Sequence, residues 1–393
     1  MEKTGLLSTI HPIDQKRLLT YAICYFSVGI GVSALGPLLP FLADNVNVSL
    51  GQISFAFTAQ NLGYLLGSAA GGRLYDRVKS HKLMVLSLSL MVVMGLLIPV
   101  MTWFYALLVV LFFFGLGVGT IDIGENLNLV WMFKSRVSPY LNAIHFVFGL
   151  GAFFTPLIIT TVMAWTGGSL SWAIWTLVLI FCPGFIGLLT LKSPVNTSSD
   201  EADFRNQDHN YVLIAIIIVL FFLAAGVQIG FGGWIFTYVS ELGIADATAA
   251  SIMTSIYWGC VTLGRLFAIP VSKKVSPGAM ILFNSAWLVF VLALILIWPT
   301  TPAMMWIGSA GMGLATSFLF PTLLSFAKTR MNMTGRITSL FFMGSSIGMM
   351  LMPMLLGLVF DTFGGCEMML VLFAAALLGL LFMILLQVKK QKL

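Results

Sequence analysis

Long apolar blocks, separated by short polar segments, make up almost the whole chain. A helix needs about 20 apolar residues to cross the hydrocarbon core of a bilayer, and hydrocarbon offers no partner to free backbone groups. The pattern therefore predicts an all-α membrane protein with twelve transmembrane helices. We place them at 18–42, 52–75, 82–101, 104–131, 139–164, 170–191, 211–240, 247–271, 277–298, 302–327, 335–360 and 367–388.

Composition narrows the class of protein further. Of the 393 residues, 59% are hydrophobic and 9% are charged, whereas a soluble domain carries about 25% charged residues. So few charges cannot cover the surface of a water-soluble enzyme. The net charge of +6 comes from basic residues that serve better as topology markers than as a nucleic-acid surface, so we expect neither an enzyme nor a nucleic-acid partner.

The basic residues follow the predicted connections. All 20 Lys and Arg residues fall on one side when the twelve spans are threaded, and the opposite connections carry acids. Positive charge marks the cytoplasmic side of a membrane protein. We therefore expect both termini in the cytoplasm, in a membrane that the compact loops suggest is a bacterial inner membrane.

The chain divides into two related halves. A polar Ser-, Asn- and Asp-rich run at 192–210 predicts a linker between six-helix bundles at 1–191 and 211–393. Residues in the two halves correspond at a constant offset, as in Gly67/Gly259, Gly72/Gly264, Arg73/Arg265 and Leu74/Leu266. Parallel repeats of this kind are typical of two-bundle secondary transporters.

Asp122 and Glu125 are the acids placed deep inside an apolar block. Their spacing of three puts both carboxyls on one helical face, and Asn126 adds an oxygen ligand beside them. Two close carboxyls at low dielectric do not both ionise easily, so one is expected to hold a proton or attract a cation. The alternative is a charge pair with Lys134 or Arg136.

Other polar side chains are candidates for binding a solute. An amide inside a membrane can contact a ligand or join helices, and a histidine can bind substrate or simply pack. We read His145 as the one membrane histidine, with no metal site, and expect no mid-membrane Lys or Arg to balance an anionic substrate. The candidates for substrate binding are Asn61, Asn126, Asn142, His145, Gln228, Tyr257 and Trp258.

Several motifs carry a family resemblance. The run Gly71–Arg77 resembles the signature of the major facilitator superfamily, and the runs 61–68, 121–126 and 143–153 resemble its sodium-dependent glucose transporter branch, near the fucose:proton symporters. The resemblance implies two bundles that expose one central site alternately, with Asp122 at an acid typical of the glucose branch. It also implies a conformational latch, made here of Gly72, Arg73, Asp76, Arg77 and Arg265.

These observations favour cation-coupled symport of a neutral small polar solute, with a hexose as the expected substrate. The coupling ion is a proton or sodium, with no other cofactor, and the protein is expected to be a monomer in the bilayer. One alternative is a proton-driven exporter of lipophilic or cationic compounds. A second alternative is a membrane sensor that transports nothing.

Overall fold

The computed structural model describes residues 11–195, 210–331, 333 and 335–388. The first half contains α1 (Pro12–Ser33), α2 (Leu35–Val46), α3 (Leu50–Ile53), α4 (Phe55–Arg77), α5 (Ser80–Leu97), η1 (Ile98–Val100), α6 (Phe104–Phe133), η2 (Lys134–Arg136), α7 (Ser138–Trp165), α8 (Leu170–Leu179) and α9 (Cys182–Thr190). The second half contains α10 (Tyr211–Glu241), α11 (Ala247–Ser272), α12 (Pro277–Ile297), α13 (Pro302–Thr316), α14 (Leu319–Arg330), α15 (Gly335–Phe363) and α16 (Gly365–Val388).

The helices follow the apolar blocks closely, and three blocks are broken. The first becomes α1 and α2, which are bent by 50°, and the sixth and tenth become α8 with α9 and α13 with α14. Within the described residues, 10 helices are long and apolar enough to cross a membrane, or 11 if the bent pair is one span. The 23-residue α4 is not among them, so the number twelve stays a prediction.

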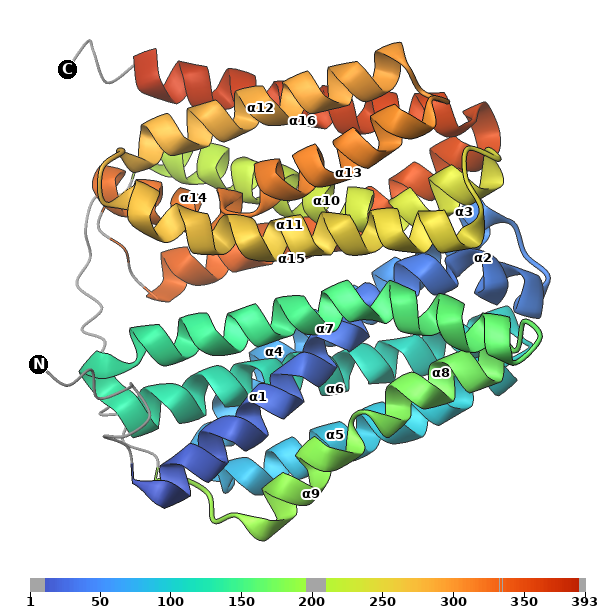
Figure 1. Ribbon diagram of the computed structural model, residues 1–393. Coiled ribbons are helices and arrows are strands. Elements are labelled where there is room, and N and C mark those ends of the chain that lie inside the picture. Colours follow the sequence, from blue (N-terminus) through green and yellow to red (C-terminus); the bar gives the residue numbers. More distant parts are fainter. Residues whose placement is uncertain (1–10, 196–209, 332, 334, 389–393) are drawn as a thin grey trace, which may run out of the picture.

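The helices form two bundles. In Figure 1, α1 and α4 to α9 lie together below and α10 to α16 lie above, in agreement with the internal repeat, while α2 and α3 lie where the two groups meet. The linker predicted at 192–210 falls mostly on residues 196–209, which lie outside the described part. The exact boundaries of the halves therefore stay predictions.

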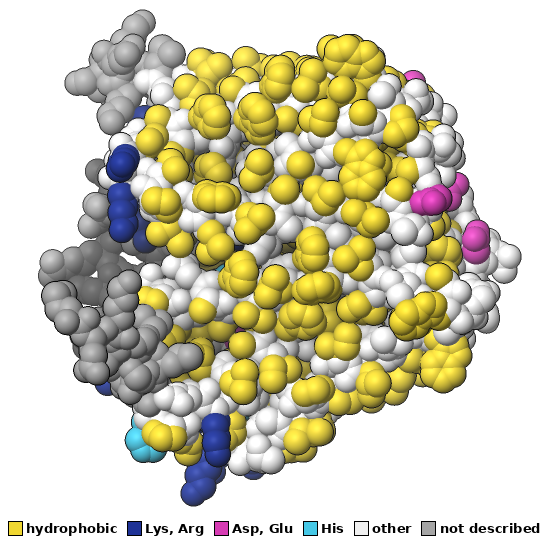
Figure 2. Space-filling view, in the orientation of Figure 1, with side chains coloured by type: hydrophobic (Ala, Val, Ile, Leu, Met, Phe, Trp, Pro, Cys, Tyr) yellow, Lys and Arg dark blue, Asp and Glu magenta, His cyan; other side chains and the backbone are white. Residues whose placement is uncertain are grey.

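Charge separates the two ends of the molecule. Figure 2 shows Lys and Arg gathered at the end that carries both chain termini, Asp and Glu at the other end, and an apolar surface between them. We call these the basic end and the acidic end. The broad apolar surface fits a protein surrounded by lipid.

The two bundles are joined near the acidic end. Hydroxyl and amide groups that follow α3 or lie in α4 donate to backbone carbonyls of α15: Ser54 to Met354 at 3.1 Å, Thr58 to Met350 at 3.1 Å and Asn61 to Met349 at 3.4 Å. On the other side, Thr160 of α7 and Ser251 of α11 form a hydrogen bond. A Cβ placed on Gly36 would lie 2.8 Å from the carbonyl oxygen of Gly233. The structure is therefore closed at the acidic end.

Glycines bring α4 and α6 into contact. A Cβ added to Gly63 or Gly67 of α4 would overlap backbone atoms of α6. A Cβ added to Gly115 or Gly119 of α6 would likewise overlap backbone atoms of α4. Small residues let membrane helices approach closely, and this approach sets where the polar groups of α4 and α6 lie.

Candidate functional site

A cluster of polar side chains surrounds Asp122 in the first bundle. Tyr25 of α1 donates from its hydroxyl to Oδ1 at 2.8 Å, and Tyr64 of α4 donates to Oδ2 at 2.5 Å. Asn126, one turn along α6, donates from Nδ2 to Oδ1 at 3.2 Å. The sequence predicts Asn126 beside Asp122, and the structure places it there.

The arrangement matches an ionised Asp122. Two hydroxyls and one amide N–H all point at the carboxyl, and a carboxylate is a pure acceptor with room for several donors. Hydrogen bonds to a charged group contribute about 1.5–3 kcal/mol each. The neighbours of Asp122 therefore supply the donors that solvate a carboxylate within the bundle.

Glu125 has a different environment. Its side chain is 0% exposed, and neither carboxyl oxygen has a hydrogen-bond partner. The groups that interact with it electrostatically are Tyr21 and Cys24 of α1, Tyr75 of α4, and Asp122 on its own helix. A carboxylate without donors or a counter-charge is very costly at such a place, so Glu125 carries its proton here.

The two acids thus have separate roles, although they share one turn of helix. Within the described residues neither one forms an ion pair, and Lys134 and Arg136, the partners in the alternative reading, are exposed. Two carboxyls whose surroundings favour opposite protonation states are a common basis for proton chemistry.

His145 joins the cluster from α7. Its Nδ1 lies 3.2 Å from the hydroxyl oxygen of Tyr25, and the two rings meet edge to face at 5.0 Å. Because Tyr25 donates its proton to Asp122, Nδ1 is the donor in the contact with His145. His145 is therefore linked to Asp122 through Tyr25.

The second bundle contributes Arg265, and this corrects the expectation that the basic residues lie in the connections. Arg265 lies inside the spanning helix α11 and not in a connection. Its Nε donates to the carbonyl of Ser317 at 3.3 Å, and its charge acts on His145 and Tyr25 across the interface between bundles. Arg265 lies about two turns before α11 ends at Ser272, and the absence of a mid-membrane Lys or Arg stays a prediction.

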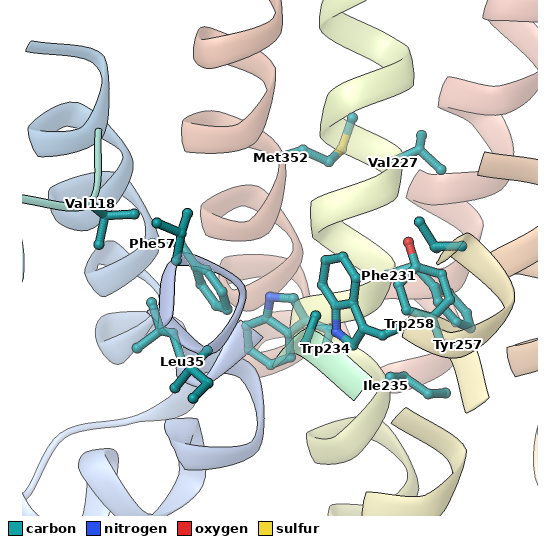
Figure 3. Packing of buried hydrophobic residues seen from close by; sticks show 14 of the residues in the cluster. Leu35, Phe57, Val118, Val227, Phe231, Trp234, Ile235, Tyr257, Trp258 and Met352 are labelled. Carbon is teal, nitrogen blue, oxygen red and sulfur yellow. The ribbon is translucent and has the colours of Figure 1, made fainter. Parts of the chain in front are cut away.

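The other candidates in the second bundle line an aromatic wall. Figure 3 shows Tyr257, Trp258, Phe231 and Trp234 packed together beside Phe57 of the first bundle. Tyr257 donates to the backbone carbonyl of Gln228 at 2.6 Å. The side-chain Nε2 of Gln228 and the indole Nε1 of Trp258 are buried donors without a partner, so both remain available to a hydroxyl-rich solute.

Asn61 and Asn142 form no hydrogen bond with the polar cluster around Asp122 or with the aromatic wall. The amide of Asn61 donates to the carbonyls of Phe57 and Met349 at 2.9 and 3.4 Å, so it joins α4 to α15. Asn142 is exposed on α7, one turn before His145 toward the basic end. In this conformation Asn61 joins helices.

The predicted latch lies at the basic end, on the last turns of α4. Arg73, Asp76 and Arg77 are exposed, and a Cβ on Gly72 would meet nothing within 4 Å. Arg265 is instead directed to the central cluster, so the structure does not bring the five latch residues together. Their role as a latch stays a prediction.

Sequence reasoning missed the tyrosines and one histidine. Tyr21, Tyr25, Tyr64 and Tyr75 surround the two acids, and His81 is buried at the start of α5 with 4% exposure. His145 is therefore not the one histidine in a spanning helix. A signal was available: Tyr21 and Tyr25 are spaced by four and so share a face of α1.

Removing one donor from Asp122 has a measurable cost. We expect Tyr64→Phe to lower the free energy of unfolding by about 1.5–3 kcal/mol, because the lost hydrogen bond serves a charged group. The matched control is Tyr238→Phe, whose hydroxyl donates to the neutral carbonyl of Pro299 at 3.0 Å and which should cost about 1 kcal/mol. Unfolding in mixed micelles measures both, and an equal loss would show that Asp122 is not charged.

Known proteins match over most of the chain. The family model described as Major Facilitator Superfamily matches residues 21–353. Sodium-dependent glucose transporter 1 of Homo sapiens is 25% identical over 85% of this chain and 72% of its own length. Major facilitator superfamily domain-containing protein 4A of Mus musculus is 26% identical over 92% of this chain and 89% of its own length.

Solved structures share the fold. The nucleoside transporter NupG superposes with a TM-score of 0.75 at 13% identity, covering 95% of this chain and 99% of that one. A D-xylose-proton symporter superposes with a TM-score of 0.74 at 12% identity, covering 94% and 97%. The apolar helices, the two bundles and the matched family model agree, and the chain belongs to the major facilitator superfamily of membrane transporters.

Proposed function

We propose that the protein is a proton-coupled symporter of a neutral sugar, with a hexose as its substrate. The observation that carries the proposal is the contrast between the two acids of α6. Asp122 is solvated by three donors, whereas Glu125 is enclosed without any. An acid that must stay neutral while enclosed, and can ionise when water reaches it, is a natural carrier of one proton per cycle.

The proton and the sugar are linked through the cost of closing the site. Protonation of Glu125 lowers the free energy of closing the site, because no charge is then buried there. Sugar hydroxyls lower it too, because they can accept from the free donors of Gln228 and Trp258. Each ligand then favours the closed state in which the other is held. Linkage of this kind makes accumulation of one solute depend on the gradient of the other.

The names of relatives support the sugar class and leave the ion to be measured. The human relative is called a sodium-dependent glucose transporter. Sodium would need several oxygen ligands, and the oxygens of Asp122, Tyr25 and Tyr64 are already engaged with one another, while Asn126 presents its amide N–H to them. We therefore favour the proton, and treat sodium as the competing result.

Uptake into proteoliposomes tests the function. Labelled D-glucose is offered together with a panel of other monosaccharides, and a pH gradient and a sodium gradient are imposed separately. We expect D-glucose to accumulate with the pH gradient alone. Accumulation that requires sodium would replace the coupling ion, and no gradient-driven uptake of any sugar would refute the proposal.

A proton-driven exporter of lipophilic cations is the second candidate. The buried acids and the aromatic wall of Phe231, Trp234, Tyr257 and Trp258, with Phe57 beside it in Figure 3, would suit a flat apolar cation. Cells that express the protein would then resist cationic dyes, and Asp122→Asn would remove that resistance. Unchanged dye sensitivity alongside sugar uptake would exclude this candidate.

We place both termini in the cytoplasm, in a bacterial inner membrane, with the protein as a monomer. The support is the gathering of Lys and Arg at the end that carries the termini, seen in Figure 2. Reporter fusions at both termini should give cytoplasmic signals, and a periplasmic signal from either would reverse the orientation.

Alternating exposure of the site requires the acidic ends of the bundles to separate. We expect a disulfide between cysteines placed at Thr160 and Ser251, in a background without the native cysteines, to abolish transport because it ties α7 to α11. Reduction should restore uptake. Full transport by the oxidised protein, with cross-linking confirmed by mass, would show that these ends do not move apart.

A further inference from the structure

Glu125 is enclosed, so its proton needs a route that does not pass through the cluster around Asp122. The groups that interact with it electrostatically from other helices are Tyr21 and Cys24 of α1 and Tyr75 of α4, and none of them forms a hydrogen bond with its carboxyl. Tyr75 donates to the carbonyl of Thr120 at 3.0 Å, and a backbone carbonyl cannot pass a proton on. The hydroxyl of Tyr21, in contrast, contacts a group that can.

Tyr21 contacts the buried histidine at the start of α5. Its hydroxyl lies 2.7 Å from Nε2 of His81, and both side chains are buried, at 0% and 4% exposure. On the other side of the ring, Nδ1 lies 2.9 Å from the carbonyl oxygen of Leu191. A carbonyl can only accept, so Nδ1 carries the ring proton and Nε2 accepts from Tyr21.

Beyond His81 the chain reaches the surface of the basic end. The backbone N–H of His81 donates to Oγ of Ser193 at 3.0 Å, and Arg17 donates to the carbonyl of Lys192 at 2.7 Å. Lys192 is exposed. Arg17 is the charged group that faces this histidine from α1. The imidazole therefore lies between Tyr21 and the surface of the basic end.

We propose that Tyr21 and His81 form a proton relay that connects Glu125 to the basic end of the protein, apart from the path of the sugar. This route rests on the proposed role of Glu125 as the coupling acid. The sequence of spans does not suggest it, because His81 falls at a predicted helix start and Tyr21 in an apolar block.

The transfer balances without a further reactant. Glu125 has no hydrogen bond to Tyr21 in this structure, so a water that enters between them takes the Glu125 proton as the O–H bond breaks and gives one of its own to the Tyr21 oxygen. The former hydroxyl proton of Tyr21 moves to Nε2 of His81. The imidazolium then releases its Nδ1 proton to water near Leu191, and its bonding electrons stay on the ring. His81 is left as the Nε2–H tautomer, and rotation of the imidazole brings that N–H to water, where proton exchange restores the Nδ1–H form. Glu125 is left as a carboxylate.

Two substitutions test the relay while sparing the packing. Tyr21→Phe removes the hydroxyl. His81→Gln keeps both hydrogen bonds, because its amide can accept from Tyr21 and donate to Leu191, but it cannot pass a proton. Tyr238→Phe, which also loses a buried hydroxyl, lies in the other bundle and serves as the matched control.

Proton release is measured on the full-length protein after an alkaline pH jump. Time-resolved infrared difference spectra follow the C=O band of the protonated Glu125 carboxyl. The Glu125→Gln variant lacks this band and so identifies it. The readout does not depend on the sugar. We expect both relay variants to slow release by about a hundredfold or more, in the range of single proton-transfer groups. The control should match the wild type.

The outcomes separate the two proposals. Release at the wild-type rate in Tyr21→Phe and His81→Gln would overturn the relay and leave Glu125 as the coupling acid. A wild-type protein whose Glu125 band never changes with pH would overturn the proposed function and the relay together. A purely structural role for His81 would leave His81→Gln at the wild-type rate, which also overturns the relay.

Discussion

Replacing Glu125 by glutamine should abolish proton-driven accumulation of D-glucose and leave equilibrium exchange of the sugar in place. Glutamine has the size of glutamic acid and stays neutral, so it imitates the protonated form that the enclosed site requires. Exchange needs the loaded carrier to move but no net proton release. The measurement compares uptake under a pH gradient with exchange at equal internal and external sugar concentrations in the same proteoliposomes.

Asp122→Asn is the matched comparison, and a different result is expected. An amide nitrogen would face Tyr25 or Tyr64, both of which donate at this position, and leaving such a group unsatisfied costs about 1–3 kcal/mol. Exchange and accumulation should fall together. If Glu125→Gln also lost both activities together, or kept its accumulation, Glu125 would not be the group that couples the proton to the sugar.

The second large effect concerns the packing that holds the acids in place. We expect Gly115→Val to destabilise the protein by about 3 kcal/mol or more, because the added carbon would overlap the backbone of Gln60. Backbone atoms cannot rotate away as a side chain can, so α4 and α6 would have to separate. The yield of monodisperse protein and the unfolding midpoint measure the loss.

Gly379→Val on α16 provides the control. A Cβ there would approach Leu223 at 3.9 Å, an ordinary contact, so the same chemical change should be tolerated far better. Equal stability of the two variants would show that α4 and α6 do not depend on close approach. A stable Gly115→Val protein that cannot transport would instead indicate that the packing matters because it positions Tyr64 against Asp122, and not because it stabilises the fold.

The two predictions depend on one another physically. Gly63 and Gly67 allow α4 to lie against α6, which brings Tyr64 within 2.5 Å of Asp122. Without that approach the carboxylate would lose a donor. The packing of small residues thus maintains the chemical difference between Asp122 and Glu125.

The family-specific motifs and the acids of α6 were accessible from the chain itself. The positions of the spans, the two-bundle repeat and the separation of charge can be predicted because each depends on local composition. The length of an apolar block and the sign of its flanking residues need no knowledge of a neighbour. The same reasoning placed Asp122, Glu125 and Asn126 on one helix at the right spacing.

The partners of those acids came from the tertiary structure alone. In a membrane the helices are apolar on nearly every side, so hydropathy does not indicate how a helix is rotated about its axis. That rotation decides that Tyr25 and Tyr64 solvate Asp122, that Tyr21 faces His81, and that Arg265 acts across the bundles. Composition along the chain determined that this protein spans a membrane as two bundles, while helix packing decided which of its acids is surrounded by hydrogen-bond donors and which is enclosed without any.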